Sequence, residues 1–517
     1  MLSNLWRMTR NLVLPLLKQA QWRPDHLALE VGEARFSYGQ LADQAGAVAG
    51  WIEREVEQRT GRVAILASRT PEAYLGALGT AWAGATYVPV NPHWPASRID
   101  QLLSITKPDA IIADAVGLKA VEKTASAARV LAPGFHLGQD RAGRNIPEPA
   151  AIASDQTAYI IFTSGSTGIP KGVCVSNANV NAFLATMRGR YDIEAHDRLS
   201  QASELTFDVS VFDMFMAWSA GASLHVVPKS QLMGPRDFIR EKQISVWFSV
   251  PSIAILMQQL KMLAPGAFPR LRHSLFAGEA LPAATAIAWR DAAPNSSVEN
   301  LYGPTEATVV CLGCEFKGEE DITPGRGIVA TGRPFDGVIA AILDANLRPV
   351  ETGTPGQLAV AGPQIAQGYL DDDELTARRF PEIGDTRWYL TGDLASVDAH
   401  GVYHHLGRID NQVKVNGHRV ELEEIESRLR LHAGSDAAVA VPWPYQRGSA
   451  RGIVAFVADS LVPLLQLQQA LRRELPSYMV PGEIRNLDKL PLGPTGKFDR
   501  KALTTLLEQD ASQEQDS

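Results

Sequence analysis

Cysteine is scarce in this sequence, with Cys174, Cys311 and Cys314 as its three copies in 517 residues. So few thiols cannot cross-link a chain of this length, and their odd number predicts a reducing compartment rather than a disulfide framework. Cys311 and Cys314 have the spacing of redox and half-zinc motifs, but no second cysteine or histidine pair stands at ligand spacing. Because residues 309–312 have the composition of a strand, we expect both to be buried small side chains.

The sequence also lacks a long apolar run near its start and a block of basic residues. The longest apolar stretch there, residues 11–17, ends at Lys18 and is too short to cross a bilayer. No small-residue cleavage site follows it, so we expect a packed N-terminal helix in a cytoplasmic protein. The formal net charge of -8, with no cluster of lysine or arginine, argues against nucleic acid or an anionic membrane as a partner.

The remaining composition is that of an ordinary globular protein with more than one domain. Hydrophobic residues make up 45 % and charged residues 21 % of the chain, which argues against disorder and a fibrous architecture. Strand-like and helix-like segments alternate, as in residues 62–67, 71–84 and 87–90. This alternation predicts an α/β fold with mainly parallel strands, and the length predicts several domain-sized units.

A domain boundary is expected near residues 407–411, where a new run of strands and helices begins. The elements expected after it are a strand at 412–415, a helix at 422–431, paired strands at 437–441 and 452–457, and a helix ending at Leu475. We therefore expect a large multi-layer α/β domain over residues 1–408 and a small, mobile α+β domain over 409–505. The polar residues 506–517 are expected to be disordered.

A loop rich in glycine and hydroxyl groups, residues 163–172, follows a predicted strand at 159–162. Its backbone N–H groups, hydroxyls and one ammonium are groups that bind a polyphosphate. The P-loop pattern of NTPases fails here because Gly172 follows Lys171, where serine or threonine should hold magnesium. A flexible surface loop is the other alternative, and it would need neither a lysine nor four hydroxyls. The candidate phosphate-binding residues are Thr163, Ser164, Gly165, Ser166, Thr167, Gly168 and Lys171.

Further motifs give the sequence a family resemblance. They are residues 36–41 (FSYGQL), 84–90 (GATYVPV), 302–306 (YGPTE), 389–394 (YLTGDL), 407–410 (GRID) and 496–500 (GKFDR). From about Phe36 to Leu503 the chain resembles the adenylate-forming superfamily of acyl-CoA synthetases, luciferases and adenylation domains of nonribosomal peptide synthetases. Within it, the sequence is most similar to stand-alone amino-acid adenylation domains, which are amino acid–carrier protein ligases. The resemblance implies an ATP-dependent enzyme that forms an acyl-AMP and pyrophosphate.

The resemblance also implies roles for single residues. Adenylation develops negative charge at a crowded phosphorus, so cations and hydrogen-bond donors are needed there. The catalytic residues implied are Lys497, which bridges the substrate carboxylate and the α-phosphate, Thr305 at the α-phosphate, Glu306 as the ligand of Mg²⁺, and Arg408 at the ribose or phosphates. The other ATP-binding residues implied are Asp393 at the ribose hydroxyls, Asn300 and Tyr302 at adenine, and Gly278. Without the family resemblance, Asn300 would be explained equally well as a turn residue, because asparagine is common in turns.

Asp410 matches the hinge of the family and falls at the boundary inferred above from composition. The resemblance implies that the small domain first delivers Lys497 and then rotates, so that residues 415–417 face the site for thioester formation. A hydrophilic linker by itself would predict flexibility but not this rotation.

Asp208 matches the aspartate that pairs with the α-ammonium of the substrate in the amino-acid branch of the family. Taken alone, it could also cap the helix that follows it. An enzyme for simple carboxylates has no use for a buried carboxylate, which is costly unless paired. The matching side-chain pocket is apolar with one hydroxyl, and its residues are Val209, Phe212, Ser249, Leu275, Ala277, Leu301, Val309 and Val310. It favours a small apolar amino acid and leaves alanine, valine and L-proline open.

The acyl acceptor is expected to be a thiol outside this chain. No Asp-Ser-Leu phosphopantetheine-attachment pattern follows Leu503, and the remaining residues are too few for a carrier domain. The resemblance implies the phosphopantetheine of a separate carrier protein, with coenzyme A as the alternative. Two other functions stay open, an acyl-CoA ligase for a non-amino acid and a non-catalytic protein of the same fold.

Overall fold

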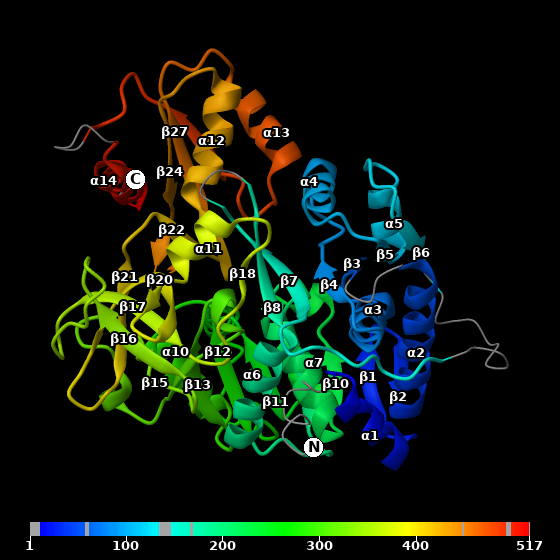
Figure 1. Ribbon diagram of the computed structural model, residues 1–517. Coiled ribbons are helices and arrows are strands. Elements are labelled where there is room, and N and C mark those ends of the chain that lie inside the picture. Colours follow the sequence, from blue (N-terminus) through cyan, green and yellow to red (C-terminus); the bar gives the residue numbers. More distant parts are fainter. Residues whose placement is uncertain are drawn as a thin grey trace. The chain divides into compact units, whose positions relative to one another are not determined.

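The computed structural model describes residues 11–56, 61–132, 134, 146–165, 169–446, 449–492 and 498–515. The chain divides into two compact units, whose elements are labelled in Figure 1. The first comprises Met1–His93, Ile99–Phe162 and Gly172–Ile409, and the second comprises Trp94–Arg98, Thr163–Lys171 and Asp410–Ser517. The long segment of the second unit begins close to the predicted boundary. This unit also takes in the loop predicted to bind phosphate, which the sequence had placed in the large domain.

A long, mainly parallel sheet of the first unit has the order β15-β14-β13-β12-β11-β9-β10-β1-β2. Its central strands are parallel, and β10 and β11 are buried along their whole length, as expected for a sheet covered on both faces. The bounds are β1 Leu27–Val31, β2 Ala34–Ser37, β9 Arg198–Gln201, β10 Ser223–Val226, β11 Val246–Ser249, β12 His273–Ala277, β13 Ser297–Tyr302, β14 Leu312–Glu315 and β15 Arg333–Pro334.

A second sheet has the order β18-β8-β7-β4-β3-β5-β6, and β7, β4, β3, β5 and β6 pair in parallel. The bounds are β3 Arg62–Leu66, β4 Thr86–Pro89, β5 Ala110–Ala113, β6 Arg129–Leu131, β7 Thr157–Thr163, β8 Lys171–Ser176 and β18 Gly368–Tyr369. The strands predicted at 62–67, 87–90 and 159–162 correspond to β3, β4 and β7. The predicted α/β fold is therefore confirmed at both sheets.

A third sheet of the first unit is antiparallel, unlike the mainly parallel arrangement predicted. Its order is β16-β17-β20-β19, and β21 also pairs with β20. The bounds are β16 Ile339–Leu343, β17 Gly356–Ala361, β19 Glu382–Ile383, β20 Thr386–Val397 and β21 Tyr403–Arg408. No helix lies between β16 and β17 or between β20 and β21 in the described chain, as is typical of connections between antiparallel neighbours.

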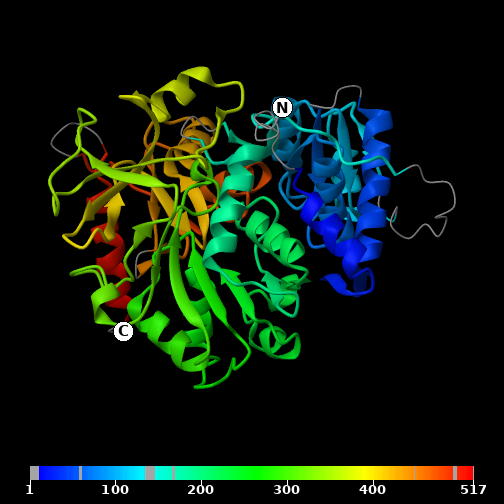
Figure 2. The ribbon, with the colours of Figure 1, turned by 60° about the horizontal axis from the view of Figure 1, so that its bottom comes forward.

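Helices cover the two mainly parallel sheets. One core cluster joins Tyr159 of β7, Phe183 of α6, Phe212 of α7 and Phe248 of β11, so both sheets share a single apolar interior. Figures 1 and 2 show α2 and α3, in blue, beside the strands of the second sheet. The bounds are α1 Leu14–Trp22, α2 Tyr38–Glu55, α3 Pro71–Trp82, α4 Ala96–Thr106, α5 Ala115–Val121, α6 Asn177–Arg190, α7 Val209–Ala220, α8 Arg236–Glu241, α9 Pro251–Gln259, α10 Ala283–Ala292 and α11 Asp373–Arg379.

Local sequence explains where α2 begins and where α7 ends. Ser37 and Gln40 form a capping box at the start of α2, each side chain accepting the backbone N–H of the other. Helix α7 ends at Gly221, whose φ of 81° is the left-handed conformation that glycine adopts without strain. The predicted N-terminal helix is present as α1, with Leu16 buried. Within the described residues, every helix is too short or too polar to span a membrane.

The second unit has an α+β composition, as predicted. Its sheets have the orders β23-β22-β26-β25 and β24-β27-β28. The bounds are β22 Gln412–Val415, β23 His418–Glu421, α12 Leu422–Ala433, β24 Ala438–Pro442, β25 Tyr445–Gln446, β26 Ser449–Ala450, β27 Ile453–Val457, α13 Leu464–Glu474, β28 Glu483–Asn486 and α14 Arg500–Gln515.

The predicted disorder of residues 506–517 differs from the structure, because α14 continues to Gln515. Leu503 and Leu507 lie one helical turn apart and are both buried in a cluster with Val439 and Phe456. An i, i+4 pair of leucines is enough to dock a helix whose other positions are polar. Composition alone did not reveal this pair.

His225 of β10 is buried and lies opposite Glu30 of β1 in the parallel register. Burial is the main influence on its imidazole and, with the nearby Arg198, lowers its pKa to about 4, against the opposing effect of Glu30. Lys242 and Arg35 add to the positive charge around it. His225 is therefore neutral at pH 7.

Lowering the pH from 7 to 5 is expected to destabilise the protein through His225. The folded pKa lies below the unfolded value of about 6.5, so this contribution is complete above pH 6.5 and is lost as the pH falls toward 4. At pH 5 the loss should reach roughly 2 kcal/mol. Urea unfolding at each pH measures it, and His225→Gln should flatten the dependence. His196→Gln, at a largely exposed histidine, should leave the slope unchanged; equal slopes in all three proteins would refute the assignment.

Candidate active site

A cluster around Asp393 brings together three of the residues predicted to bind ATP. The paired strands β20 and β21 place Asp393 opposite Arg408, whose guanidinium donates to the carboxylate at 2.9 Å. The Tyr302 hydroxyl, at the end of β13, donates to the other carboxylate oxygen at 2.5 Å. His405, which was not among the predicted residues, lies 3.4 Å from the carboxylate. In the sequence, the signal that could have identified His405 is its position two residues before Gly407 of the GRID motif.

The electrostatics of this cluster keep Asp393 ionised. Burial alone would raise its pKa, but the hydrogen bond with His405 and the charge of Arg408 outweigh burial and hold the pKa well below its usual range. An ionised carboxylate only accepts hydrogen bonds, so it suits a ligand with neighbouring hydroxyl donors. Because Tyr302 and Arg408 already orient both oxygens, the acceptor is fixed before any ligand arrives.

Asn300 presents a buried acceptor that has no partner among the described residues. Its amide nitrogen donates to the carbonyls of Val329 (3.3 Å) and Ala330 (2.8 Å), which leaves the Oδ1 atom without a hydrogen bond. An orphaned buried acceptor is costly unless a ligand or water supplies a donor. The exocyclic amine of adenine is such a donor. Gly278, just after β12, has a φ of 92°, a left-handed conformation that explains a glycine there.

Glu306 lies in a short 3-10 helix, Thr305–Ala307, and is 1 % exposed. The Tyr369 hydroxyl, which was not among the predicted residues, donates to one of its carboxylate oxygens at 2.8 Å and orients it. No group of three or more potential metal ligands occurs among the described histidine, cysteine and acidic residues. A single carboxylate still fits Mg²⁺, which commonly completes its coordination with substrate phosphates and water.

The backbone after Glu306 is strained and is held by side chains. Thr308 and Val309 have φ values of 55° and 70°, in the left-handed region that β-branched residues rarely occupy. The Gln364 side-chain amide donates to the carbonyls of Ala307 and Val310, both at 2.8 Å, and the backbone carbonyl of Gln364 accepts from the Thr308 hydroxyl. The strand predicted at 309–312 therefore begins only at Leu312, because these bonds commit the preceding residues to a turn.

Asp208 occupies the N-cap position of α7, but its side chain makes no capping hydrogen bond. One carboxylate oxygen instead accepts the N–H of Val309, at 3.2 Å, and so helps to hold the strained turn. The side chain is 9 % exposed. The capping alternative is therefore wrong for this residue.

The residues predicted to surround a substrate side chain belong to neighbouring elements. Ser249, Ala277 and Leu301 stand at or near the carboxyl ends of three adjacent parallel strands, where α/β folds commonly bind ligands. The one hydroxyl among them is already used, since Ser249 accepts from the Trp247 indole (2.9 Å) and donates to a backbone carbonyl. The surface is effectively apolar. The remaining predicted members are buried or half-buried within the same core: Val209, Phe212, Leu275, Val309 and Val310.

Two buried tyrosines lie near Asp208 and were missed at the sequence level. Tyr87 and Tyr159 pair in the register of β4 and β7, with ring centroids 5.5 Å apart. Burial, together with the charge of Asp208, raises the pKa of both phenols. Neither hydroxyl has a hydrogen-bond partner among the described residues. Tyr87 stands in the GATYVPV motif and Tyr159 just before the glycine-rich loop, but neither motif indicates that the two hydroxyls are neighbours.

The glycine-rich loop belongs to the second unit, where its donors contact carboxylates. The Gly165 N–H donates to Glu424 at 3.4 Å, and the Lys171 ammonium lies 3.5 Å from Glu421. The hydroxyl of Ser164 accepts the N–H of Glu421. In this structure the two donors are therefore occupied by carboxyl groups of the same unit.

For the other predicted residues the structure shows few contacts or does not describe the position. Thr163 ends β7 and Thr305 begins the 3-10 helix. Asp410 opens the long segment of the second unit, and its carboxylate accepts the N–H of Gln412. Ser166, Thr167, Gly168 and Lys497 lie outside the described residues. Cys311 and Cys314 are buried free thiols, as expected.

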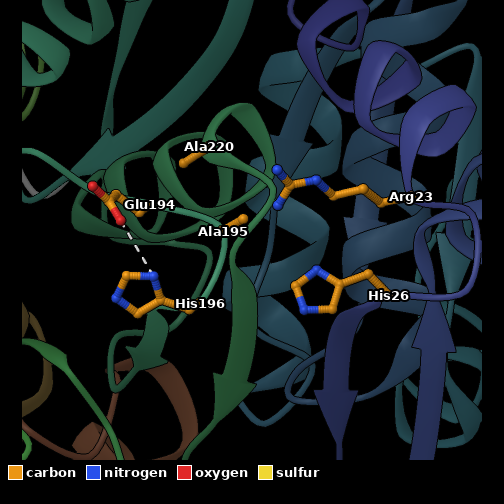
Figure 3. A pocket seen from close by; sticks show the side chains of 6 residues that line it. All are labelled: Arg23, His26, Glu194, Ala195, His196 and Ala220. Atoms are coloured by element: carbon orange, nitrogen blue, oxygen red, sulfur yellow. Dashed lines mark ion pairs between the residues drawn. The ribbon is translucent and has the colours of Figure 1, made fainter.

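A surface pocket of about 570 Å³ is lined by described residues that do not include any predicted site residue (Figure 3). Glu194 and His196 form an ion pair across one side of it, at 3.3 Å, and Arg23 and His26 face them. All four are exposed. The pocket does not coincide with the chemistry described above, so we do not assign the active site to it.

The fold and these residues define an adenylate-forming enzyme with an α/β architecture. The family described as AMP-binding enzyme matches residues 16–370, more than half of the chain, and the chain belongs to this family. The dimodular nonribosomal peptide synthase of Bacillus subtilis (strain 168) is 33% identical over 501 residues, covering 94% of this chain and 20% of that protein. Tyrocidine synthase 2 of Brevibacillus parabrevis is 33% identical over 490 residues, covering 94% of this chain and 13% of that protein.

The chain thus spans about a fifth or less of these curated relatives. Solved structures match it over nearly its whole length. The Vibrio cholerae adenylation domain AlmE, in complex with glycyl-adenosine-5'-phosphate, superposes with a TM-score of 0.87 and 31% identity, covering 96% of this chain and 98% of that chain. IdnL7 gives a TM-score of 0.72 and 34% identity, covering 97% and 100%. These matches confirm the predicted resemblance and fold class.

Proposed function

We propose that the protein activates an amino acid with a small apolar side chain as its aminoacyl-AMP and transfers it to the phosphopantetheine thiol of a separate carrier protein. L-Proline is one candidate substrate. In the first step a carboxylate oxygen attacks the α-phosphorus and pyrophosphate leaves. In the second the thiol attacks the acyl carbon and AMP leaves. The glycyl adenylate bound to AlmE is a product of the same kind with a small amino acid.

Asp208 is the observation that carries this proposal. Its side chain is buried, accepts the N–H of Val309, which is one of the predicted lining residues, and does not cap α7. A substrate α-ammonium would compensate its charge, and the apolar lining would leave a charged or polar side chain unpaired. Because the hydroxyl proton of Ser249 is already donated to a backbone carbonyl, we expect this residue not to donate a hydrogen bond to a polar substrate.

Asp393, Asn300 and Tyr302 are proposed to hold the adenosine of ATP, and Lys171 and the loop hydroxyls its phosphates. Bound Mg²⁺ would supply positive charge to the phosphates as pyrophosphate departs. Glu306 would be its protein ligand, oriented by Tyr369. Thr305 and Lys497 are proposed to donate to the α-phosphate, and Arg408 to keep Asp393 in place. Asp410 is proposed as the hinge of the two half-reactions.

Amino-acid-dependent ATP–pyrophosphate exchange tests the proposal. A panel of amino acids should give exchange with small apolar members and little with charged ones. Exchange with none of them, in protein that binds ATP, would refute amino-acid activation. Transfer to phosphopantetheinylated carrier proteins and to coenzyme A, run side by side, then distinguishes the two acceptors.

Asp393→Asn is expected to raise the KM for ATP about tenfold or more. The substitution keeps the shape but removes the charge that accepts the ribose hydroxyls, and each such hydrogen bond is worth roughly 1.5–3 kcal/mol. The matched measurement uses 2'-deoxy-ATP, which lacks one hydroxyl. The wild type should discriminate between the two nucleotides and the variant should do so much less. Undiminished discrimination in the variant would contradict the ribose assignment.

An acyl-CoA ligase for a carboxylic acid without an amine is the second candidate. It is favoured by the Val309 N–H, which gives the Asp208 carboxylate a structural partner without any substrate. Pyrophosphate release with simple apolar acids and coenzyme A, but not with amino acids, would establish it.

A further inference from the structure

We propose that a second pocket of the first unit, remote from the strand-end site, binds a small amphiphilic anion, namely a carboxylate on an aliphatic or aromatic body. The pocket has a volume of about 450 Å³. It is formed by α8 with the residues just after it and by residues 261–270, which follow α9. These segments lead into β11 and β12 at their amino ends, whereas the predicted substrate residues stand at or near the carboxyl ends. The proposal therefore does not depend on the proposed function.

The floor of this pocket is apolar and belongs to the protein core. Ile239, Ile244 and Phe268 are each at most 3 % exposed and line it, together with the half-buried Met262 and Ala267. A pocket of several hundred cubic ångströms with a mainly apolar lining and a few polar groups is the usual form of a small-molecule site. The floor would bury the apolar body of a ligand.

The rim carries only positive charge. Arg236, Arg240, Lys261 and Arg270 line the pocket, and no carboxylate does among the residues that the structure describes. Arg236 is paired with its exposed neighbour Asp237, but the other three form no ion pair within the described ranges. This lining is a local excess of cations in a chain whose net charge is -8. It selects an anion and disfavours a cation.

Two further cavities lack this combination. In the pocket of Figure 3, the carboxylate of Glu194 lines the cavity beside Arg23, and the apolar lining among the described residues consists of Ala195 and Ala220. A pocket of about 410 Å³ in the second unit also has apolar lining residues, but its basic ones are Arg473 and His432, and His432 is already paired with Glu474. An apolar floor below three cations without an ion pair in the described part of the chain therefore distinguishes the α8 pocket from these two.

Binding of decanoate, decanol and decyltrimethylammonium, measured by calorimetry without ATP, tests the charge requirement. We expect decanoate to bind, its Kd to rise with salt, and the neutral and cationic analogues to bind at least about tenfold more weakly. The triple variant Arg240→Gln/Lys261→Gln/Arg270→Gln should weaken decanoate binding about tenfold or more. These side chains are exposed, so the fold should tolerate the changes. Arg23→Gln, in the pocket of Figure 3, is the matched control and should leave the Kd unchanged.

A second measurement locates the ligand. In protein labelled with ¹³C-methyl methionine, decanoate should shift the signal of Met262, which Met262→Leu identifies, and leave that of the buried Met214 of α7 in place. Equal binding of decanol and decanoate, an unchanged Kd in the triple variant, or no binding up to the solubility limit would each overturn the proposal. Tight binding of an acidic amphipathic peptide without binding of decanoate would instead assign the pocket to a protein partner.

Discussion

Replacing Asp208 by asparagine is expected to lower kcat/KM for the amino acid roughly 10²–10³-fold, because breaking a buried ion pair costs about 3–5 kcal/mol. Asparagine keeps the volume, and its carbonyl can still accept the N–H of Val309, so the strained turn should persist. The variant thus tests the negative charge of Asp208 separately from its hydrogen bond with the Val309 N–H. The KM for ATP should change little, since Asp393 and Asn300 are untouched.

Asp213 provides the matched control for this variant. It lies on the same helix, α7, is buried, and burial raises its pKa well above its usual range. Asp213→Asn makes the same change of side chain at a position outside the predicted substrate residues and should leave the amino-acid KM near that of the wild type. An Asp208→Asn enzyme with full amino-acid activity would remove the ammonium-binding role. Gain of activity on the acid that lacks the amino group would favour the acyl-CoA ligase.

Lys497→Ala is expected to abolish adenylation, with a loss of about 10²-fold or more, because a charge that stabilises the developing negative charge at phosphorus is removed. Thioester formation from a supplied aminoacyl-adenylate should continue near the wild-type rate, since in the two-step scheme Lys497 serves only the first half-reaction. Single-turnover measurements of each half-reaction separate the two.

Lys501→Ala is the control for Lys497. Lys501 is an exposed lysine on α14, four residues further along the chain, and its loss should affect neither half-reaction. Equal loss of both half-reactions in Lys497→Ala would contradict the rotation about Asp410. Retained adenylation would remove Lys497 from the mechanism altogether.

Local signals predicted much of the fold correctly. The strands at 62–67, 159–162 and 412–415 and the helix at 422–431 were visible because their apolar periodicity is contained within a few residues. The tail was mispredicted, since a single pair of leucines docks α14 although its composition is polar. The strand expected at 309–312 failed for a different reason. Hydrogen bonds from Gln364, more than fifty residues away, turn that backbone out of the extended conformation.

The order of motifs along the chain was enough to establish the family and to select Asp393, Arg408, Glu306 and Asp208, because each stands in a contiguous run of characteristic residues. Which residues, distant in sequence, contact these side chains was decided by the tertiary structure. Strand pairing in the third sheet brings Arg408 and His405 close to Asp393. The packing of Trp247 beside Ser249 gives the serine hydroxyl a hydrogen-bond partner within the protein. The α8 pocket likewise needs two segments to meet. Strand register and side-chain packing are long-range choices, and neither composition nor periodicity encodes them directly.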